Sequence, residues 1–315
     1  MEAPVISVIV PCYNEQQVLP FAIPKLLSQL KMMIENNTVS NNSFILCCDD
    51  GSNDNTWQLI EQYHIIDSHI KGLSLNSNRG HQNVLMAGIM HVKDKCDAAI
   101  TIDADLQDDP DAIVQMIEEF KHGSEVVYGI RQSRRADSLI KRITSKCYYS
   151  MQKLFGLESV ANHADCRLLS RYAMECLSQY SEQNIYLRGI IAQMGLKSSK
   201  VYYNRLARIA GKSKYTIGKM LDLAIDGITS FTSRPLRIIF ITGLLLLLLD
   251  IIMSIYVFLS YFGHNVIPGW TSLMLSLWFL GSLILIGIGV VGEYVGKIYV
   301  EVKHRPRYQI KQVLE

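Results

Sequence analysis

This sequence of 315 residues lacks the commonest nucleotide-binding motifs. Neither a Gly-x-Gly-x-x-Gly segment nor a Walker lysine follows its first apolar run, which disfavours two frequent ways of holding a nucleotide. The net charge of +2 is close to balance, so no bulk nucleic-acid role is indicated and we expect no nucleic-acid partner. The seven cysteines include no Cys-x-x-Cys pair, and no secretory signal is visible, so we expect reduced, mostly buried thiols.

The first half contains short apolar runs that alternate with helix-forming segments. A β-branched run lies at 5–10, and further short strand-like runs lie at 44–48, 73–75, 99–102 and 126–131. Helical segments are expected up to about residue 33, and at 57–63, 82–91 and 111–120. Strands and helices alternating at this spacing predict an α/β fold with a doubly wound, mostly parallel sheet.

Polar side chains follow three of these runs directly. They are Asn14 and Glu15, Asp49 and Asp50, and Asp103 and Asp105. The carboxyl ends of parallel strands meet at one edge of the sheet, where open α/β sheets bind ligands. Asp103 and Asp105 are two residues apart at a strand end and suit one hard divalent cation bridging a diphosphate. Asp49 or Asp50 could accept from a base or ribose, with Arg79 supplying positive charge. The alternative for Asp103–Asp105 is a solvated acidic loop.

Four segments together resemble the family 2 glycosyltransferases. They read Val-Pro-Cys-Tyr-Asn-Glu, Asp-Asp-Gly-Ser-Asn-Asp-Asn-Thr, Asn-Arg-Gly-His-Gln and Asp-Ala-Asp-Leu-Gln-Asp. Within that family, the whole chain is similar to the polyprenyl-phosphate glycosyltransferases, which use dolichol or bactoprenol phosphate. The resemblance implies an inverting transferase with the Rossmann-like glycosyltransferase A fold, a nucleotide-sugar donor and Mg²⁺ or Mn²⁺. Asp109 stands where the family usually has Pro, from which we expect only a local change in the loop.

The same resemblance assigns roles to individual residues. The nucleotide sugar is expected on Pro11, Tyr13, Glu15, Asp49, Asp50, Arg79, Asp103 and Ala104. The metal ligands are expected at Asp103, Asp105 and Gln107, although Gln107 could instead be a turn residue facing water. Asp105 and Asp165 are the predicted catalytic residues.

Further residues are predicted to bind phosphates of the donor and acceptor. Asn162–Arg171 resembles the family segment Gly-Asp-Phe-Arg-Leu-Leu-Asp-Arg and places Asp165 towards the acceptor. A phosphate monoester is largely ionised above its second pKa of about 6, so Asp165 is expected to orient the acceptor more than to deprotonate it. The alternative is a structural pair of Asp165 with Arg167 or Arg171. The predicted phosphate and acceptor ligands are Arg131, Arg142, Arg167, Arg208, Ser213 and Lys214.

The predicted phosphate-binding segments have simpler alternatives, and two histidines are not assigned to the site. The basic residues after Arg131 could form a solvated face, and the 205–215 loop could be a flexible tail. His81 and His163 have no metal-ligand spacing and are interpreted as hydrogen-bonding structural residues.

Apolar residues concentrate after Arg237. The runs 238–262 and 270–291 are each long enough to cross about 30 Å of hydrocarbon. Their outer flanks are basic and their connection has no Lys or Arg, which predicts a two-helix transmembrane hairpin with both termini cytoplasmic. Tyr215–Ser233 is amphipathic and could lie at the membrane interface. A buried helical hairpin of a soluble core is the alternative.

The predicted domains are a cytoplasmic glycosyltransferase domain at 1–212, interfacial amphipathic helices at 213–236, a transmembrane hairpin at 237–296 and a cytoplasmic tail at 297–315. The predicted reaction moves a hexose, first of all from UDP-glucose, to polyprenyl phosphate at the cytoplasmic face of the cell membrane. UDP-GlcNAc and GDP-mannose are alternative donors. A processive polysaccharide synthase is disfavoured because no Gln-x-x-Arg-Trp motif is present, and a non-catalytic membrane subunit is a third possibility. Asp250 within the first span, together with the resemblance, suggests a homo-oligomer such as a tetramer.

Overall fold

The computed structural model describes residues 3–131, 163–183, 185–204 and 269–315, with isolated positions between 236 and 255. The chain divides into two compact units. One consists of Met1–Met151, Glu158–Thr216 and Arg305–Glu315, and the other of Gln152–Leu157 and Ile217–His304. Several predicted features lie outside the described residues: Arg142, Arg208, Ser213, Lys214, Tyr215–Ser233 and Asp250.

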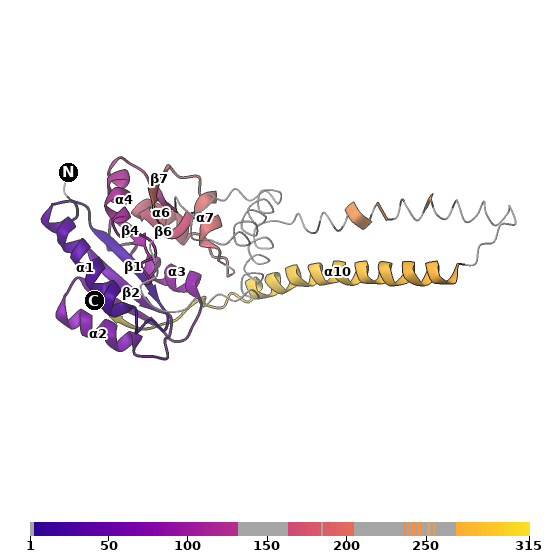
Figure 1. Ribbon diagram of the computed structural model, residues 1–315, viewed down its shortest axis with the longest axis horizontal. Helices are drawn as coiled ribbons and strands as arrows, with labels where there is room; N and C mark the ends of the chain where they lie inside the picture. Colours follow the sequence, from indigo (N-terminus) through magenta and orange to yellow (C-terminus); the bar gives the residue numbers. More distant parts are fainter. Residues whose placement is uncertain are drawn as a thin grey trace. The chain divides into compact units, whose positions relative to one another are not determined.

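The first unit is built on one eight-stranded sheet in the order β7-β5-β6-β4-β1-β2-β3-β8. Figure 1 labels several of these strands, among them β1 and β2. The strands are β1 (Ile6–Cys12), β2 (Phe44–Asp49), β3 (Ile70–Leu75), β4 (Ala98–Thr101), β5 (Val126–Arg131), β6 (His163–Ser170), β7 (Ser198–Tyr203) and β8 (Ile310–Leu314). The strands from β4 to β3 pair in parallel, as do β5 and β7. β6 and β8 run antiparallel to their neighbours. The predicted α/β class with a mostly parallel sheet is confirmed.

Helices cover both faces of this sheet. They are α1 (Leu19–Glu35), α2 (Thr56–Ile66), α3 (His81–Val92), α4 (Ala112–Lys121), α6 (Arg171–Ser178) and α7 (Leu187–Gln193). Gly88 of α3 lies directly against Ile9 and Cys48, where a Cβ atom would come within 2.8 Å of either side chain. The alternate strand residues Val8 and Val10 belong to the core cluster that includes residues of α1 and α4. Burial on both faces explains why these strands are continuous apolar runs.

Three strands were missed by the sequence analysis: β6, β7 and β8. β7 pairs in parallel with β5 at one end of the sheet order. β6 contains the Asp165 segment and lies between β4 and β5, antiparallel to both. β8 comes from the predicted polar tail and pairs antiparallel with β3, Ser74 opposite Gln312. The C-terminal residues 305–315 therefore belong to the same unit as the first strands.

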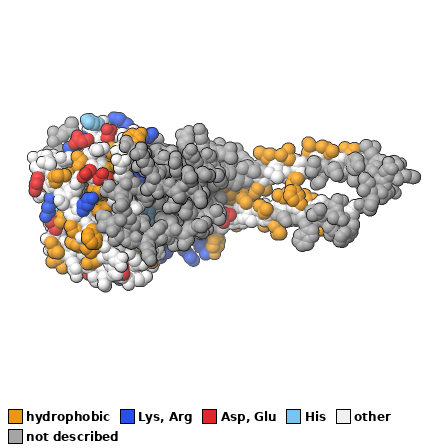
Figure 2. Space-filling view, in the orientation of Figure 1, with side chains coloured by type: hydrophobic (Ala, Val, Ile, Leu, Met, Phe, Trp, Pro, Cys, Tyr) orange, Lys and Arg blue, Asp and Glu red, His pale blue; other side chains and the backbone are white. Residues whose placement is uncertain are grey.

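The second unit contains α10, which runs from Trp270 to Val302. Its segment Phe279–Val302 is long and apolar enough to cross a membrane, and it is the one such helix among the described residues. Large apolar side chains on α10 are exposed, as Figure 2 shows by its colouring, and Leu285 reaches 71% exposure. Most of the 238–262 run lies outside the described residues, so the two-helix hairpin stays a prediction.

Candidate active site

The predicted ligand-binding residues gather at the carboxyl edge of the central strands. The backbone N–H of Asp50 donates to the carbonyl of Cys12 (2.8 Å), and that of Ile102 donates to the carbonyl of Ile9 (3.0 Å). These bonds bring the loops after β2 and β4 beside the end of β1. Pro11 is buried in β1, and Tyr13 and Glu15 are partly buried in the turn after it.

Asp49 and Asp50 are both buried, and each accepts hydrogen bonds from a neighbouring segment of the chain. Asp49 accepts a hydrogen bond from the Ser74 hydroxyl (2.9 Å). Asp50 accepts from the backbone N–H groups of Arg79 (2.7 Å) and Gly80 (2.9 Å). Burial raises the pKa of Asp50, and the two N–H bonds oppose that rise. Asp50 thus shapes the loop before α3 and Asp49 links β2 to β3, and the predicted contact of both residues with a nucleotide stays a prediction.

Side chains alternate between inside and outside along the loop that follows β4. Asp103, Asp105 and Gln107 are partly exposed, whereas Ala104, Leu106, Asp108 and Pro110 are buried. Leu106 adopts a positive φ of 48°, and the Gln107 backbone N–H donates to Asp105 Oδ1 at 3.2 Å. The loop therefore presents its three predicted metal ligands outward while it buries Ala104, a predicted nucleotide-sugar contact.

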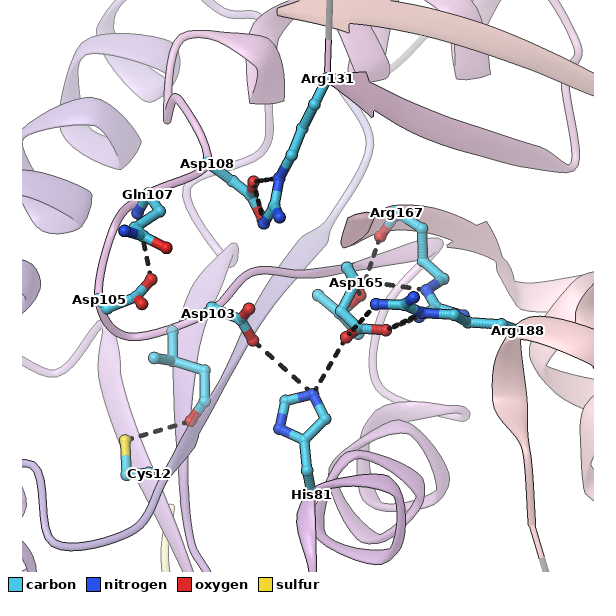
Figure 3. A network of polar contacts seen from close by, with 12 residues as sticks. Cys12, His81, Asp103, Asp105, Gln107, Asp108, Arg131, Asp165, Arg167 and Arg188 are labelled. Atoms are coloured by element: carbon cyan, nitrogen blue, oxygen red, sulfur yellow. Dashed lines mark hydrogen bonds and ion pairs between the residues drawn. The ribbon is translucent and has the colours of Figure 1, made fainter. Parts of the chain in front are cut away.

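His81 lies between two carboxylates that are far apart in the sequence (Figure 3). Its Nε2 is 3.7 Å from Asp103 Oδ1 and 3.6 Å from Asp165 Oδ2. Burial opposes the charged ring, but Asp165 and Asp103 outweigh it and raise the pKa of His81. Burial also raises the pKa of Asp103 to about 6, with further contributions from nearby carboxylates. The sequence analysis did not place His81 in the site, and the only signal for it was its position directly after the Asn-Arg-Gly loop.

Asp165 is held by two arginines. Arg167 Nη2 lies 2.5 Å from Asp165 Oδ1, and Arg188 of α7 donates from Nε to Oδ1 (3.0 Å) and from Nη2 to Oδ2 (2.8 Å). Burial alone would raise the pKa of Asp165, but Arg188, His81 and Arg167 outweigh it and hold it well below its usual range. The Asp165–Arg167 pair considered from the sequence is present, whereas Arg171 pairs with Asp97 at 3.1 Å. Arg188 was not predicted.

Two of the predicted phosphate-binding arginines already contact a carboxylate. Arg167 is 1% exposed and contacts Asp165. Arg131 donates from Nε to Asp108 Oδ1 at 2.7 Å, and its Nη2 lies 2.7 Å from the same oxygen (Figure 3). Their contact with a phosphate stays a prediction.

The loop after β4 has the donor chemistry for a divalent cation. Asp103, Asp105 and Gln107 offer carboxylate and amide oxygens, which Mg²⁺ and Mn²⁺ prefer. The crowding of Asp105, Asp108 and Asp165 around Asp103 contributes to its raised pKa, and a bound cation would compensate that charge. No three His, Cys, Asp or Glu side chains form a metal cluster in the described part of the chain. The residues present fit a cation that is held jointly with a substrate diphosphate.

Comparisons with known proteins agree with this arrangement. Residues 7–178 match the sequence model of glycosyl transferase family 2. The uncharacterized glycosyltransferase YkoT of Bacillus subtilis (strain 168) is 42% identical over 307 residues, covering 98% of this chain and 91% of that protein. The prophage bactoprenol glucosyl transferase homolog of Escherichia coli (strain K12) is 36% identical over 313 residues, covering 98% and 99%.

Among solved structures, mannosyltransferase PcManGT from Pyrobaculum calidifontis, in complex with GDP-Man and Mn²⁺, matches with a TM-score of 0.50. The match covers 96% of this chain and 87% of that one at 14% sequence identity. At this identity the likeness concerns the fold alone.

Proposed function

The chain belongs to glycosyl transferase family 2 and is a glycosyltransferase; from this premise we propose that it transfers a hexose from a nucleotide sugar to polyprenyl phosphate with inversion. The mixed α/β sheet is typical of the Rossmann-like glycosyltransferase A fold. The observation that carries the proposal is the contact of His81 with both Asp103 and Asp165. This contact links Asp103, which is expected to lie at the donor, to Asp165, which is expected to lie at the acceptor.

The donor side uses the loop after β4. Asp103, Asp105 and Gln107 would hold Mg²⁺ or Mn²⁺, which when bound neutralises charge on the departing nucleoside diphosphate. PcManGT was solved with GDP-Man and Mn²⁺, and several relatives are named bactoprenol glucosyl transferases. The glucosyl transferase names of these relatives support glucose as the sugar, and we take UDP-glucose as the first donor to test. UDP-GlcNAc and GDP-mannose remain the alternative donors.

The acceptor side uses Asp165 and the residues that hold it. In an inverting displacement, a phosphate oxygen of the acceptor bonds to the anomeric carbon as the carbon–diphosphate bond breaks. The acceptor phosphate is largely ionised above pH 6 or so, and it needs no strong base. The lowered pKa of Asp165 makes it a poor base at neutral pH but a permanent charge for orienting neighbouring groups. Arg131, Arg167 and the basic residues outside the described part are the candidate phosphate contacts.

The return of the chain to the sheet supports a double membrane crossing. β7 and β8 belong to one sheet, although α10 lies between them in the sequence. A chain that leaves one side of a membrane and returns to it crosses an even number of times. If α10 crosses, a second crossing is required, and the 238–262 run is the segment with the length for it. We therefore retain the multi-pass arrangement in the cell membrane, with the sheet unit cytoplasmic and the chain assembled as a homo-oligomer, as part of the proposal.

A transfer assay tests the reaction. The purified full-length protein is incubated with undecaprenyl phosphate, Mn²⁺ and radiolabelled UDP-glucose, UDP-GlcNAc or GDP-mannose in separate reactions. We expect a labelled lipid from one donor, with an inverted anomeric configuration in its NMR spectrum, and no product from the Asp105→Ala variant. If no donor yields product with either Mg²⁺ or Mn²⁺, the non-catalytic membrane subunit becomes the better interpretation.

A further inference from the structure

Asp108 is the only carboxylate of the 103–110 loop that is completely buried. We propose that Asp108 is a positioning residue that, through Arg131, sets the loop so that Asp105 and Gln107 face the nucleotide diphosphate. The inference rests on the proposed function, because it names the residue that shapes the donor site. It also gives Arg131 a second role, besides the phosphate contact proposed above.

The contact between the two residues anchors the loop to the sheet. Asp108 Oδ1 receives both Nε and Nη2 of Arg131, each at 2.7 Å. Arg131 is the last residue of β5, where it stands opposite Tyr203 of β7. The guanidinium therefore extends from the end of a strand that is paired on both sides.

Two hydrogen bonds and one unusual backbone conformation describe the turn of the loop. Its turn contains the weak bond from Leu106 N–H to the Asp103 carbonyl (3.2 Å) and that from Gln107 N–H to Asp105 Oδ1 (3.2 Å). Leu106 takes a left-handed conformation that an L-residue with a branched side chain rarely adopts unless it is held there. The buried side chains of Leu106 and Asp108 keep the backbone in this conformation, and they flank Gln107 on both sides.

The chemistry of Asp108 distinguishes it from its neighbours. Leu106 can be held by hydrophobic burial alone, but a buried carboxylate needs a compensating charge. Arg131 supplies it, so removal of Arg131 leaves a buried carboxylate without that charge, and removal of either partner breaks the contact that holds the loop to the end of β5. Asp105 and Gln107 are then no longer held facing outward. We expect the loop to lose affinity both for a divalent cation and for the diphosphate that shares it.

A double-mutant cycle separates this role from direct phosphate binding. The variants are Asp108→Asn, Arg131→Gln and the double variant in the full-length protein, with Asp111→Asn as an exposed acidic control three residues further on. Mn²⁺ binding is measured by electron paramagnetic resonance with UDP and, separately, with GDP. The transfer assay supplies kcat and KM for the lipid phosphate.

We expect each single variant to weaken Mn²⁺–nucleotide binding at least tenfold, Asp111→Asn to change it less than twofold, and the double variant to be no weaker than the worse single variant. Coupled residues give such non-additive effects. Multiplicative effects, or an Arg131→Gln variant that raises only the KM for lipid phosphate, would overturn the inference. If Asp108→Asn does not fold, the double variant decides, because its two amides leave no unpaired charge.

The transfer assay and the Mn²⁺-binding measurement can fail independently of each other. A wild-type protein that binds Mn²⁺ with UDP or GDP but transfers no sugar contradicts the proposed reaction, while the binding measurements still test Asp108. A wild-type protein that binds Mn²⁺ with neither nucleotide overturns the inference about Asp108 as well.

Discussion

Replacement of Arg188 by alanine tests the network around Asp165 most directly. Arg188 makes two charge-assisted contacts to Asp165, at 3.0 and 2.8 Å, and its side chain is 31% exposed. Truncation of one partner of a buried charge pair costs about 2–5 kcal/mol. Asp165 keeps Arg167 and water reaches part of the vacated site, so we expect the lower end, about 2–3 kcal/mol. For a unit of this size that is a decrease in Tm of roughly 4–12 °C.

The pH dependence of this loss follows from the lowered pKa of Asp165. A carboxyl group whose pKa is depressed by folding stabilises the protein fully above its unfolded pKa of about 3.9, and that contribution disappears as the pH falls through the folded value. Arg188 is the largest favourable contributor to the depression. The Tm difference between wild type and Arg188→Ala should therefore be similar at pH 7 and pH 5 and shrink below about pH 4.

The measurement is thermal unfolding of the full-length protein in detergent, followed by circular dichroism at each pH, with a thiol-reactive dye as a second probe at pH 7 only, because the dye needs the thiolate. Five of the described cysteines are buried and become reactive only on unfolding: Cys12, Cys47, Cys48, Cys96 and Cys166. Arg171→Ala is the matched control, because Arg171 contacts Asp97 with both side chains nearly half exposed (48% and 45%), which is worth at most about 1 kcal/mol. The interpretation is wrong if the two variants melt within about 2 °C of each other at pH 7.

Three further predictions concern the cation, the C-terminal strand and the membrane arrangement. Asp105→Ala should abolish transfer and Mn²⁺-dependent UDP binding while leaving the Tm unchanged, because it removes a partly exposed oxygen ligand; retained activity would contradict the metal assignment. A chain ending at residue 304 should melt at a lower temperature and bind UDP more weakly, because β8 covers β3 and the Gln309 carbonyl accepts from Asn76 N–H (3.0 Å) at the start of the Asn-Arg-Gly loop; an unchanged Tm would show that β8 is dispensable. Single-cysteine variants at Asn265 and Asn41, in a background without native cysteines, should react with an impermeant thiol reagent in intact cells only at 265, and reaction at 41 alone would reverse the proposed orientation.

The sequence by itself determined the central strands and the edge where the site lies. Strands buried on both faces are mostly apolar, so β1, β2, β4 and β5 were visible as short apolar runs. Parallel strands bring their carboxyl ends together, so polar residues after successive runs had to meet. The outward side of the 103–110 loop was also foreseeable, since Asp103, Asp105 and Gln107 alternate with residues that are mostly apolar.

Only the tertiary structure decided which distant charges meet. β6 was hidden because its Arg167 is buried, and an arginine inside a sheet is stable only through partners that local sequence does not show, here Asp165. β8 was hidden because its pairing with β3 joins residues separated by more than 200 positions, for which short-range patterns carry no signal. The contacts of His81, Arg131 and Arg188 with carboxylates 22 to 84 residues away depend in the same way on strand order, which the sheet topology sets and no local motif encodes.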